Sequence, residues 1–245
     1  MTETPHHPPI TLSPIGVIAS DYPDKFGIPR QPGLAPAARA SLILVPPFDD
    51  PLAVRGLEDF SHLWLTFLFH LSPEQVGAKD WTPLVRPPRL GGNAKVGVFA
   101  SRSTHRPNRL GLSLVELVEI DTRRGVRLML GGADLVSGTP VIDIKPYLPW
   151  AEARPDARAG FAPEAPLKLP VAFSDAAMTA LAKRPDGDSL HELIQQVLAQ
   201  DPRPAYRQGA EARLYGVRLR DVDVRFQVVA ADAVARIEVV EIVAA

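Results

Sequence analysis

A series of short segments rich in β-branched, aromatic and aliphatic residues fills the first 150 residues, and no helical pattern separates them. The segments cover residues 15–20, 38–45, 62–71, 95–103, 112–120, 126–132 and 140–149. Turn-forming stretches at 121–125 and 137–140 separate several of them. Short strands without intervening helices favour a sandwich or a closed barrel over a doubly wound sheet. This pattern therefore predicts a mainly β fold for the first part of the chain.

The chain changes character after residue 152. Residues 153–170 are rich in alanine, proline and charge without any period, which is typical of a linker. Beyond them, Ser174 predicts the cap of a helix that runs to about Arg184, and the Ser189-x-x-Glu192 capping box predicts a second helix. Two strand-like segments follow, so the protein is expected to be α+β overall. We expect a flexible tail at 1–10, a β domain at 11–152, a linker at 153–170 and a small α+β domain at 171–245.

The composition excludes several classes of protein. The chain has no cysteine, which excludes disulfides, a thiolate nucleophile and cysteine-based zinc sites. No window approaches eighteen apolar residues, and the N-terminus lacks the pattern of a secretory signal, so a cytoplasmic protein without a membrane span is expected. Phosphate-loop, G-x-G-x-x-G, H-E-x-x-H and G-x-S-x-G motifs are missing from the sequence. We therefore expect no metal site and no Rossmann-type cofactor binding.

Positive charge is concentrated in one segment of a chain whose formal net charge is −1. No acidic residue occurs between Trp81 and Glu116, whereas the same stretch holds several cations. These are Arg86, Arg89, Lys95, Arg102, Arg106 and Arg109. A solvated surface loop is one interpretation. However, prolines and glycines interleave with the arginines and fix the backbone, and arginine suits carboxylates, phosphates and base edges. The segment is therefore a candidate anion or nucleic-acid site.

Other candidates lie outside this segment. His70 ends an aromatic strand, and backbone contacts alone could explain it. Asp143 and Lys145 are two residues apart on a segment expected to be a half-buried strand, which places both side chains on one face. A functional role is one interpretation of this pair, because charged groups on a half-buried strand need a reason, and a surface ion pair is the other. The stretch "DPRPAYR" (201–207) indicates either a solvated loop or a second contact for nucleic acid.

Five motifs resemble one known family. They are "KFGIPRQPGL", "VRGLEDFSHLWLTFLFH", "RPPRLGGNAKVGVFASRSTHRPNRLGLSLVEL", "DLVSGTPVIDIKPYLPWAE" and "AQDPRPAYR". In this order they resemble the TsaA-like (TrmO) tRNA methyltransferases. The resemblance implies an N-terminal β-barrel, a homodimer, and S-adenosylmethionine bound outside the Rossmann scheme. It implies transfer of a methyl group to N6 of threonylcarbamoyladenosine at tRNA position 37.

The resemblance also implies a cofactor pocket. Its residues would be Arg30, Gln31, Pro32, His70, Leu71, Arg102, Leu112, Gly131, Gly132, Ala133 and Asp134. An arginine can hold the carboxylate of the cofactor, an aspartate can accept from a hydroxyl or amine, and glycines allow close backbone approach. The sequence departs from the usual family pattern at Leu71, Arg109 and Ser137, which affects local contacts and tRNA preference more than activity.

Roles for the remaining candidates are hypotheses within that resemblance. Asp143 is our first choice as general base, with Lys145 and Tyr147 orienting it or holding the threonyl carboxylate, and His70 is the second choice. Contacts with RNA are assigned to Arg106, Asn108, Arg203, Tyr206 and Arg207. A non-catalytic RNA-binding barrel is an alternative function, and a barrel that binds a small acidic metabolite is another.

Overall fold

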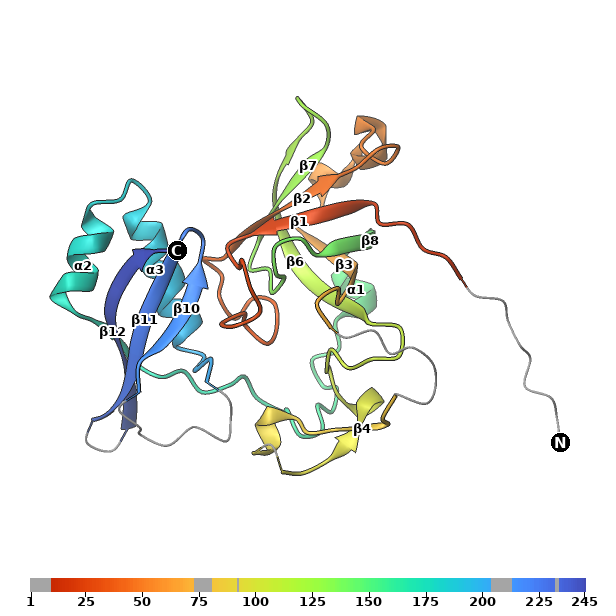
Figure 1. The fold of residues 1–245 in the computed structure, drawn as a ribbon. Helices are drawn as coiled ribbons and strands as arrows, with labels where there is room; N and C mark the ends of the chain where they lie inside the picture. Colours follow the sequence, from red (N-terminus) through yellow and green to blue (C-terminus); the bar gives the residue numbers. More distant parts are fainter. Residues whose placement is uncertain (1–9, 73–80, 92, 204–212, 232–233) are drawn as a thin grey trace.

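Six antiparallel strands close into a barrel in the N-terminal part of the chain. We describe a computed structural model that covers residues 10–72, 81–91, 93–203, 213–231 and 234–245. The barrel strands are β1 (Gly16–Ser20), β2 (Arg39–Leu44), β3 (His62–Leu68), β6 (Leu110–Asp121), β7 (Arg127–Gly131) and β8 (Pro140–Pro146). Their order around the barrel is β1-β2-β7-β6-β3-β8 (Figure 1). The expected mainly β fold with an N-terminal barrel is confirmed.

Alternation along the strands fills the barrel. Successive side chains of a strand point to opposite faces, and on β3 Leu63, Leu65 and Phe67 point inward and are buried. Leu128 and Leu130 of β7, the strand on the other side of β6 from β3, do the same. The residues between them point outward and are partly exposed, which is the period-two pattern that predicted these strands.

An irregular lobe interrupts the barrel between β3 and β6. Its described residues, 81–91 and 93–109, include a two-stranded sheet of β4 (Leu84–Val85) and β5 (Val96–Gly97) and the 3-10 turns η3 (Pro88–Leu90) and η4 (Val98–Ala100). The prediction of one strand over 95–103 is therefore wrong beyond residue 97. The barrel is closed without this segment, so its apolar residues build a separate lobe, drawn in yellow in Figure 1.

Short turns and a short helix decorate the barrel. The 3-10 turns η1 (Pro51–Val54) and η2 (Leu57–Asp59) connect β2 to β3. The helix α1 (Pro149–Glu152) follows β8, which ends at Pro146 rather than at residue 149 as expected.

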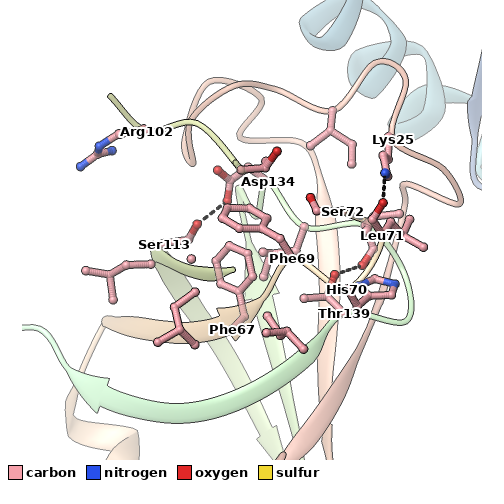
Figure 2. Close-up of a pocket in the computed structure, with 18 of the residues that line it drawn as sticks. Lys25, Phe67, Phe69, His70, Leu71, Ser72, Arg102, Ser113, Asp134 and Thr139 are labelled. Atoms are coloured by element: carbon pink, nitrogen blue, oxygen red, sulfur yellow. Dashed lines mark hydrogen bonds between the residues drawn. The ribbon is translucent and has the colours of Figure 1, made fainter. Parts of the chain in front are cut away.

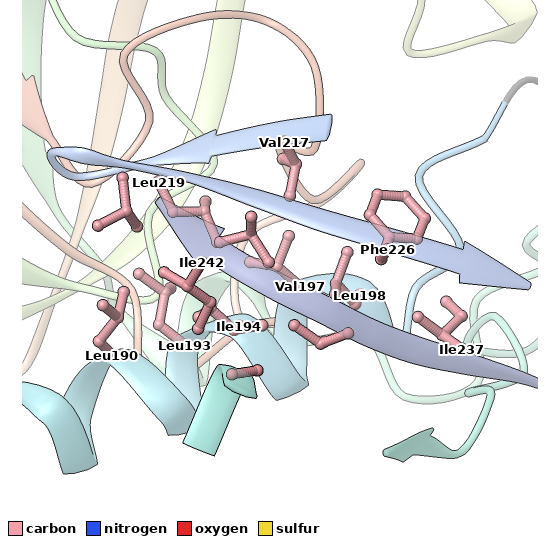
Figure 3. Close-up of a cluster of buried hydrophobic side chains, with 14 of the residues drawn as sticks. Leu190, Leu193, Ile194, Val197, Leu198, Val217, Leu219, Phe226, Ile237 and Ile242 are labelled. Carbon is pink, nitrogen blue, oxygen red and sulfur yellow. The ribbon is translucent and has the colours of Figure 1, made fainter. Parts of the chain in front are cut away.

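The C-terminal part is an α+β unit with its own core. Its elements are β9 (Val171–Phe173), α2 (Asp175–Ala182), α3 (Gly187–Leu198), β10 (Tyr215–Leu219), β11 (Val222–Ala231) and β12 (Val234–Ala244), with sheet order β10-β11-β12-β9. The apolar face of α3 packs on the sheet, and its side chains at helical spacing are fully buried (Figure 3). These are Leu190, Leu193, Ile194, Val197 and Leu198.

The two helices begin at different kinds of signal. Ser174 caps α2 as predicted, because its hydroxyl oxygen accepts from the amide of Ala177 at 3.1 Å. The predicted cap at Ser189 is wrong: α3 begins at Gly187, and the Ser189 hydroxyl donates to the carbonyl of Asp186. A Cβ at Gly187 would lie 2.2 Å from the carbonyl oxygen of Leu181, so a glycine here lets α3 start directly against the end of α2.

The loop between β1 and β2 joins the two parts. Tyr22, Ala35 and Ala38 of this loop belong to the C-terminal core rather than to the barrel core. Gly27 has φ +91°, and a Cβ there would lie 2.2 Å from the Val217 side chain. The loop thus packs into the core of the C-terminal unit and approaches Val217 more closely than a side chain at residue 27 would permit.

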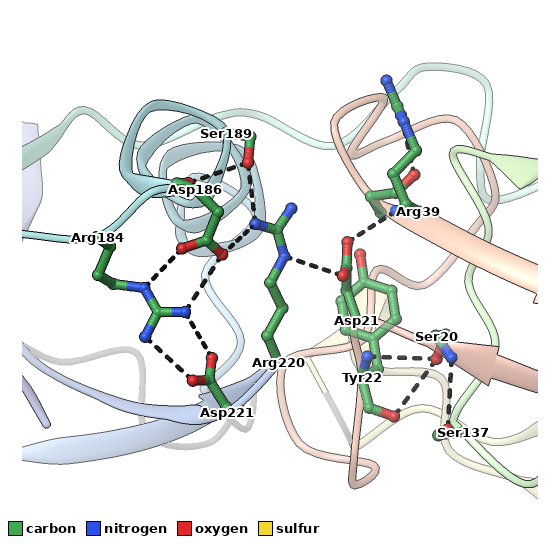
Figure 4. Close-up of polar contacts among 11 residues, drawn as sticks. Ser20, Asp21, Tyr22, Arg39, Ser137, Arg184, Asp186, Ser189, Arg220 and Asp221 are labelled. Atoms are coloured by element: carbon green, nitrogen blue, oxygen red, sulfur yellow. Dashed lines mark hydrogen bonds and ion pairs between the residues drawn. The ribbon is translucent and has the colours of Figure 1, made fainter. Parts of the chain in front are cut away.

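Charged groups reinforce this junction. Arg220 donates to Asp21 at 3.0 Å, to Asp186 at 2.9 Å and to Ser189 at 3.0 Å (Figure 4). Arg184 bridges Asp186 and Asp221 from the other side. Asp21 begins the β1–β2 loop, so this network connects the barrel to the C-terminal unit.

Candidate functional site

A cavity of about 470 Å³ lies where the β1–β2 loop, the end of β3, the lobe and the turn after β7 meet (Figure 2). Pockets for ligands of cofactor size usually span about 300–1,000 Å³. The sequence places these segments far apart, but the barrel topology brings them together. Because β3 and β6 are antiparallel neighbours, the end of β3 lies beside the start of β6, with Leu68 opposite Leu110.

An aromatic wall forms one side of the cavity. The rings of Phe67 and Phe69 meet edge to face with centroids 5.1 Å apart. Gly111 lies opposite Phe67 in the strand register, and a Cβ at this position would lie 2.3 Å from the Phe67 ring. The glycine therefore makes room for the ring, which any larger residue would displace.

Asp134 supplies a carboxylate to the cavity. Its Oδ1 atom accepts a hydrogen bond from the Ser113 hydroxyl at 2.7 Å. Burial raises the pKa of Asp134, and the hydrogen bond from Ser113 and the charge of Arg102 act in the opposite direction. Among the described residues that line the cavity, Asp134 is the single acidic side chain. It can accept hydrogen bonds from a hydroxyl or amino group of a ligand.

Cationic side chains surround the rest of the cavity. Lys25, Arg30, Arg102 and Arg106 all line it. Arg102 donates to the side-chain oxygen of Gln31, and Lys25 donates to the backbone oxygen of Leu71. The cavity is therefore electropositive apart from Asp134 and suits a ligand that carries a carboxylate or phosphate.

His70 lines the cavity two residues after the end of β3. Burial lowers the pKa of His70 below its ordinary value, and the charge of Lys25 lowers it further. A neutral imidazole can accept a proton, so His70 has the protonation state that a base requires near neutral pH.

The cavity brings together most of the residues that the resemblance assigned to the cofactor. They are Arg30, Gln31, His70, Leu71, Arg102, Leu112 and Asp134. Arg106, which we had assigned to RNA, also lines the cavity. The described lining does not include Pro32, Gly131, Gly132 or Ala133.

Gly132 instead supports the cavity from behind. It has φ +63°, and its carbonyl accepts from the amide of Gly33 at 2.8 Å, while its own amide donates to Ala38. A Cβ at residue 132 would lie 3.3 Å from the Cα atom of Gly33. The two turns that present Gln31 and Asp134 are thus packed backbone to backbone.

The first-choice catalytic residues lie elsewhere. Asp143 and Lys145 lie on one face of the half-buried strand β8 as expected, and this is the exposed outer face of the barrel. Tyr147 packs edge to face against His62 and Trp64, with ring centroids 6.4 and 6.2 Å away. Within one chain, none of the three is part of the described lining of the cavity.

The expected RNA contacts are divided by the structure. Asn108 is exposed near the C-terminal end of the lobe. Arg203 is buried, with 1% of its side chain exposed, and its guanidinium pairs with Asp201 at 2.8 Å. A guanidinium enclosed in this way stabilises the loop after α3 and is not presented to RNA, so we withdraw Arg203 as a contact. Tyr206 and Arg207 lie outside the described residues.

Sequence reasoning missed several lining residues. Lys25, Phe67, Phe69, Ser113 and Thr139 all contribute to the cavity. Phe67 and Phe69 belong to an apolar segment, and apolar character alone does not distinguish cavity-lining residues from core residues. Ser113 carried a usable signal, since a hydroxyl at an inward position of a strand requires a polar partner, which is Asp134.

Family models match nearly the whole described chain. The "tRNA-methyltransferase O N-terminal domain" covers residues 17–153 and the "TrmO C-terminal domain" covers residues 166–245. The chain belongs to the TrmO family. Its recognition from motifs is thereby confirmed.

Individual relatives agree with this membership. The tRNA (adenine(37)-N6)-methyltransferase of Escherichia coli is 53% identical over 220 residues, which cover 87% of this chain and 91% of that protein. A Pseudomonas aeruginosa protein that carries the name S-adenosylmethionine-dependent methyltransferase RcsF is 51% identical and covers 88% of this chain and 91% of its own length. A crystal structure of TrmO from Pseudomonas aeruginosa superposes with a TM-score of 0.76 at 42% identity, covering 96% of this chain and 98% of that chain.

Within the described ranges, no group of three or more His, Asp or Glu side chains is arranged to hold a metal ion. In the same part of the chain, no helix has the length and apolar character needed to cross a membrane.

Proposed function

We propose that this member of the TrmO family transfers a methyl group from S-adenosylmethionine to N6 of adenosine 37 in tRNA. The observation that carries the proposal is the electropositive cavity, in which seven residues that the family resemblance assigned to the cofactor meet. The names of the relatives agree with it, since they are tRNA (adenine(37)-N6)-methyltransferases and an S-adenosylmethionine-dependent methyltransferase. Action on tRNA also implies a cytoplasmic location.

The residues of the cavity fit the cofactor chemically. Arg102, Arg30 and Lys25 offer cations to its carboxylate, and Asp134 offers an acceptor to the ribose hydroxyls or the amino groups. Phe67 and Phe69 offer an apolar wall to its adenine or its thioether region. When bound, the cofactor supplies the electrophilic methyl group of its sulfonium.

The finer substrate that we propose is threonylcarbamoyladenosine at position 37. This modified base carries a carboxylate, which Arg106 of the cavity lining can bind, and we assign the exposed Asn108, two residues further along the chain, to the same group. The cavity residues would hold N6 in line with the methyl carbon, and such alignment can supply about 7–11 kcal/mol of the barrier reduction. The urea-like N–H of the substrate is easier to deprotonate than that of an ordinary amine.

Two residues remain as proposed bases. His70 lines the cavity and is kept neutral by burial, so it can take the N6 proton within one chain. Asp143 pairs with Thr66, and Thr66 pairs with Leu112 at the cavity rim. Because strands are spaced about 4.8 Å apart, Asp143 lies about 10 Å from Leu112 along the outside of the barrel. Asp143 can therefore act only in the cavity of a second subunit, if a dimer places it there together with Lys145 and Tyr147.

A homodimer is therefore part of the proposal. The face of β6, β3 and β8 that carries Asp143 also exposes apolar surface, since Leu112 is 58% exposed and the neighbouring Trp150 of α1 is 83% exposed. Exposed apolar surface of this kind is typical of an interface. A second subunit seated on this face would lie at the mouth of the cavity.

Methyl transfer to two matched tRNA preparations tests the function. One preparation carries threonylcarbamoyladenosine at position 37, and the other lacks only that modification. Labelled S-adenosylmethionine should transfer its methyl group to the first alone. Transfer to neither, although the cofactor binds, would contradict the substrate. Absence of cofactor binding would favour the non-catalytic RNA-binding barrel.

Mixed variants test the base and the dimer together. Asp143→Asn and Arg102→Ala should each be inactive if Asp143 is the base. If the cavity is shared between subunits, mixing the two proteins should restore about a quarter of the activity, because one of the two sites in each hybrid dimer is intact. Full activity of Asp143→Asn with loss of activity in His70→Asn would assign the base to His70.

A further inference from the structure

The lobe presents an exposed aromatic ring that the proposed cofactor and base do not use. Phe99, in the 3-10 turn η4, is 70% exposed. Many large apolar side chains of this protein are buried in its two cores, whereas this phenyl ring is exposed on a lobe outside the barrel. The ring does not line the cavity, but residues on both sides of it in the sequence belong to the lobe that borders the cavity.

The backbone that carries Phe99 is firmly held. The neighbouring Val98 is 1% exposed, and its amide donates to the carbonyl of Pro83 at 2.8 Å. The Ser101 hydroxyl donates to the carbonyl of Val98 at 2.9 Å and closes the turn. The buried valine anchors the turn, and the turn directs the next side chain outward. The ring is therefore presented in a fixed position.

Two contacts place this ring beside the cavity. The ring of Trp81 lies 6.0 Å from the Phe99 ring at a tilt of 35°, which supports one side of it. The guanidinium of Arg106 lies 5.9 Å from the Phe99 ring centroid, and Arg106 also lines the cavity. One arginine therefore touches both the proposed adenosine site and the exposed ring.

The electrostatic setting of Phe99 favours an anionic partner. The lobe has no acidic residue from Trp81 through the end of the basic segment, and it holds the cations Arg86, Arg89 and Lys95 in addition to the arginines of the cavity. A flat apolar ring among cations is the combination with which proteins hold single-stranded nucleic acid, because the cations bind phosphates and the ring stacks on a base. A neutral or basic protein surface would gain nothing from these charges.

We propose that Phe99 stacks on a nucleobase next to adenosine 37 when that adenosine enters the cavity. The inference rests on the proposed function and adds a positioning residue for the tRNA. An enzyme that acts on N6 must take the adenosine out of its stack, which exposes the face of a neighbouring base. Phe99 replaces the lost stacking partner, and Arg106 holds the phosphate or the modified base between the ring and the cavity.

Variants of Phe99 test this role. Phe99→Ala should lower kcat/KM for modified tRNA about ten- to a hundredfold, the usual effect of losing one base–aromatic stack. Phe99→Trp should retain activity within about threefold, since its ring can stack equally well. The affinity for S-adenosylmethionine should not change in either variant. Leu52→Ala is the matched control, because Leu52 is 72% exposed on the 3-10 turn η1, away from the lobe (Figure 1).

An abasic substrate separates stacking from a structural effect. Modified anticodon stem-loops that lack the base at position 36 or at position 38 are assayed with wild type and with Phe99→Ala. The cost of Phe99→Ala should disappear for one of the two abasic substrates. An equal cost in all substrates, or no cost in the intact one, would overturn the inference while leaving the methyl transfer of the wild type intact. If the wild type itself transfers no methyl group, the proposed function fails and this inference fails with it.

Discussion

Replacement of Arg220 by glutamine should loosen the junction between the barrel and the C-terminal unit. Of the three side-chain hydrogen bonds that Arg220 makes, the one to Asp21 crosses this junction, and those to Asp186 and Ser189 hold the guanidinium in place within the C-terminal unit. Its side chain is 18% exposed, and that of Asp21 is 12% exposed. The backbone at residue 220 has φ 54°, and glutamine keeps this conformation at the same strain, so the substitution changes the guanidinium alone.

The magnitude follows from what the partners retain. Breaking a fully buried ion pair costs about 3–5 kcal/mol, because a charge is left without a partner. Here Asp186 keeps Arg184, and Asp21 keeps the amide of Arg39 at 2.8 Å, so neither carboxylate is abandoned. Hydrogen bonds to charged groups contribute about 1.5–3 kcal/mol each, and partial exposure reduces this sum. We expect a loss of about 2–3 kcal/mol in the free energy of unfolding. This corresponds to a Tm lower by about 4–12 °C.

The assay compares two identical substitutions by thermal and urea unfolding. Arg225→Gln is the control, since Arg225 also contacts two carboxylates, Asp223 and Glu241, but its side chain is 42% exposed. Solvent screens exposed pairs of that kind, and they contribute little to stability. Equal losses in the two variants would refute the reasoning, because they would show that solvent screens the junction as it screens the surface of the sheet.

Further predictions concern single positions. Gly27→Ala should lower the free energy of unfolding by about 2 kcal/mol or more, because its Cβ would meet the Val217 side chain. Gly56→Ala should lower it by about 1 kcal/mol, since the positive φ is strained there but no atom lies within 4 Å of the new Cβ. Chemical unfolding of both variants checks the difference. Asp134→Asn should leave the Tm of the free protein equal or higher. Burial raises the pKa of the Asp134 carboxyl, so the charged carboxylate, which forms as pH rises through that pKa, is less favourable in the folded protein than in the unfolded chain, and asparagine carries no charge. The same variant should lose about ten- to a hundredfold in S-adenosylmethionine affinity by calorimetry. Burial lowers the pKa of His70, so as pH falls the imidazole is protonated in the unfolded chain before it is protonated in the folded one. Stability therefore falls as pH drops below about 6.5, the ordinary pKa of histidine. His70→Asn should flatten the dependence of Tm on pH between 5 and 7.

Strands and helices could be predicted where burial has a clear period. On β3 every second residue is buried, and α3 buries one face at helical spacing, so local sequence and tertiary packing agree. The prediction of one strand over residues 95–103 was wrong beyond residue 97, because these apolar residues pack in a small lobe and not in the barrel. Composition does not distinguish an apolar segment of the lobe from a strand of the barrel. The start of α3 also depended on a contact between Gly187 and Leu181 that only the packing of two helices creates.

The motifs predicted which residues line the cofactor cavity, but they did not predict how the side chains are arranged in it. Arg102 and Asp134 were recognised because the family resemblance marks them, but nothing local in the sequence shows that Ser113 fixes the Asp134 carboxylate. Asp143 and Lys145 shared one face as expected, yet the face pointed outward. Which side of a strand faces the core depends on the register of its neighbours, and two-residue spacing alone cannot determine it.

The β1–β2 loop gives the C-terminal unit a direct effect on the cavity. Tyr22 and Ala35 of this loop lie in the C-terminal core, and Arg30 and Gln31 between them line the cavity. The position of the two cavity residues is therefore set by how the loop packs on the C-terminal sheet. It follows that Arg220→Gln should weaken cofactor binding as well as stability, although Arg220 does not line the cavity. By the same linkage, saturating S-adenosylmethionine should recover part of the lost Tm, because a ligand that binds only the folded state stabilises it.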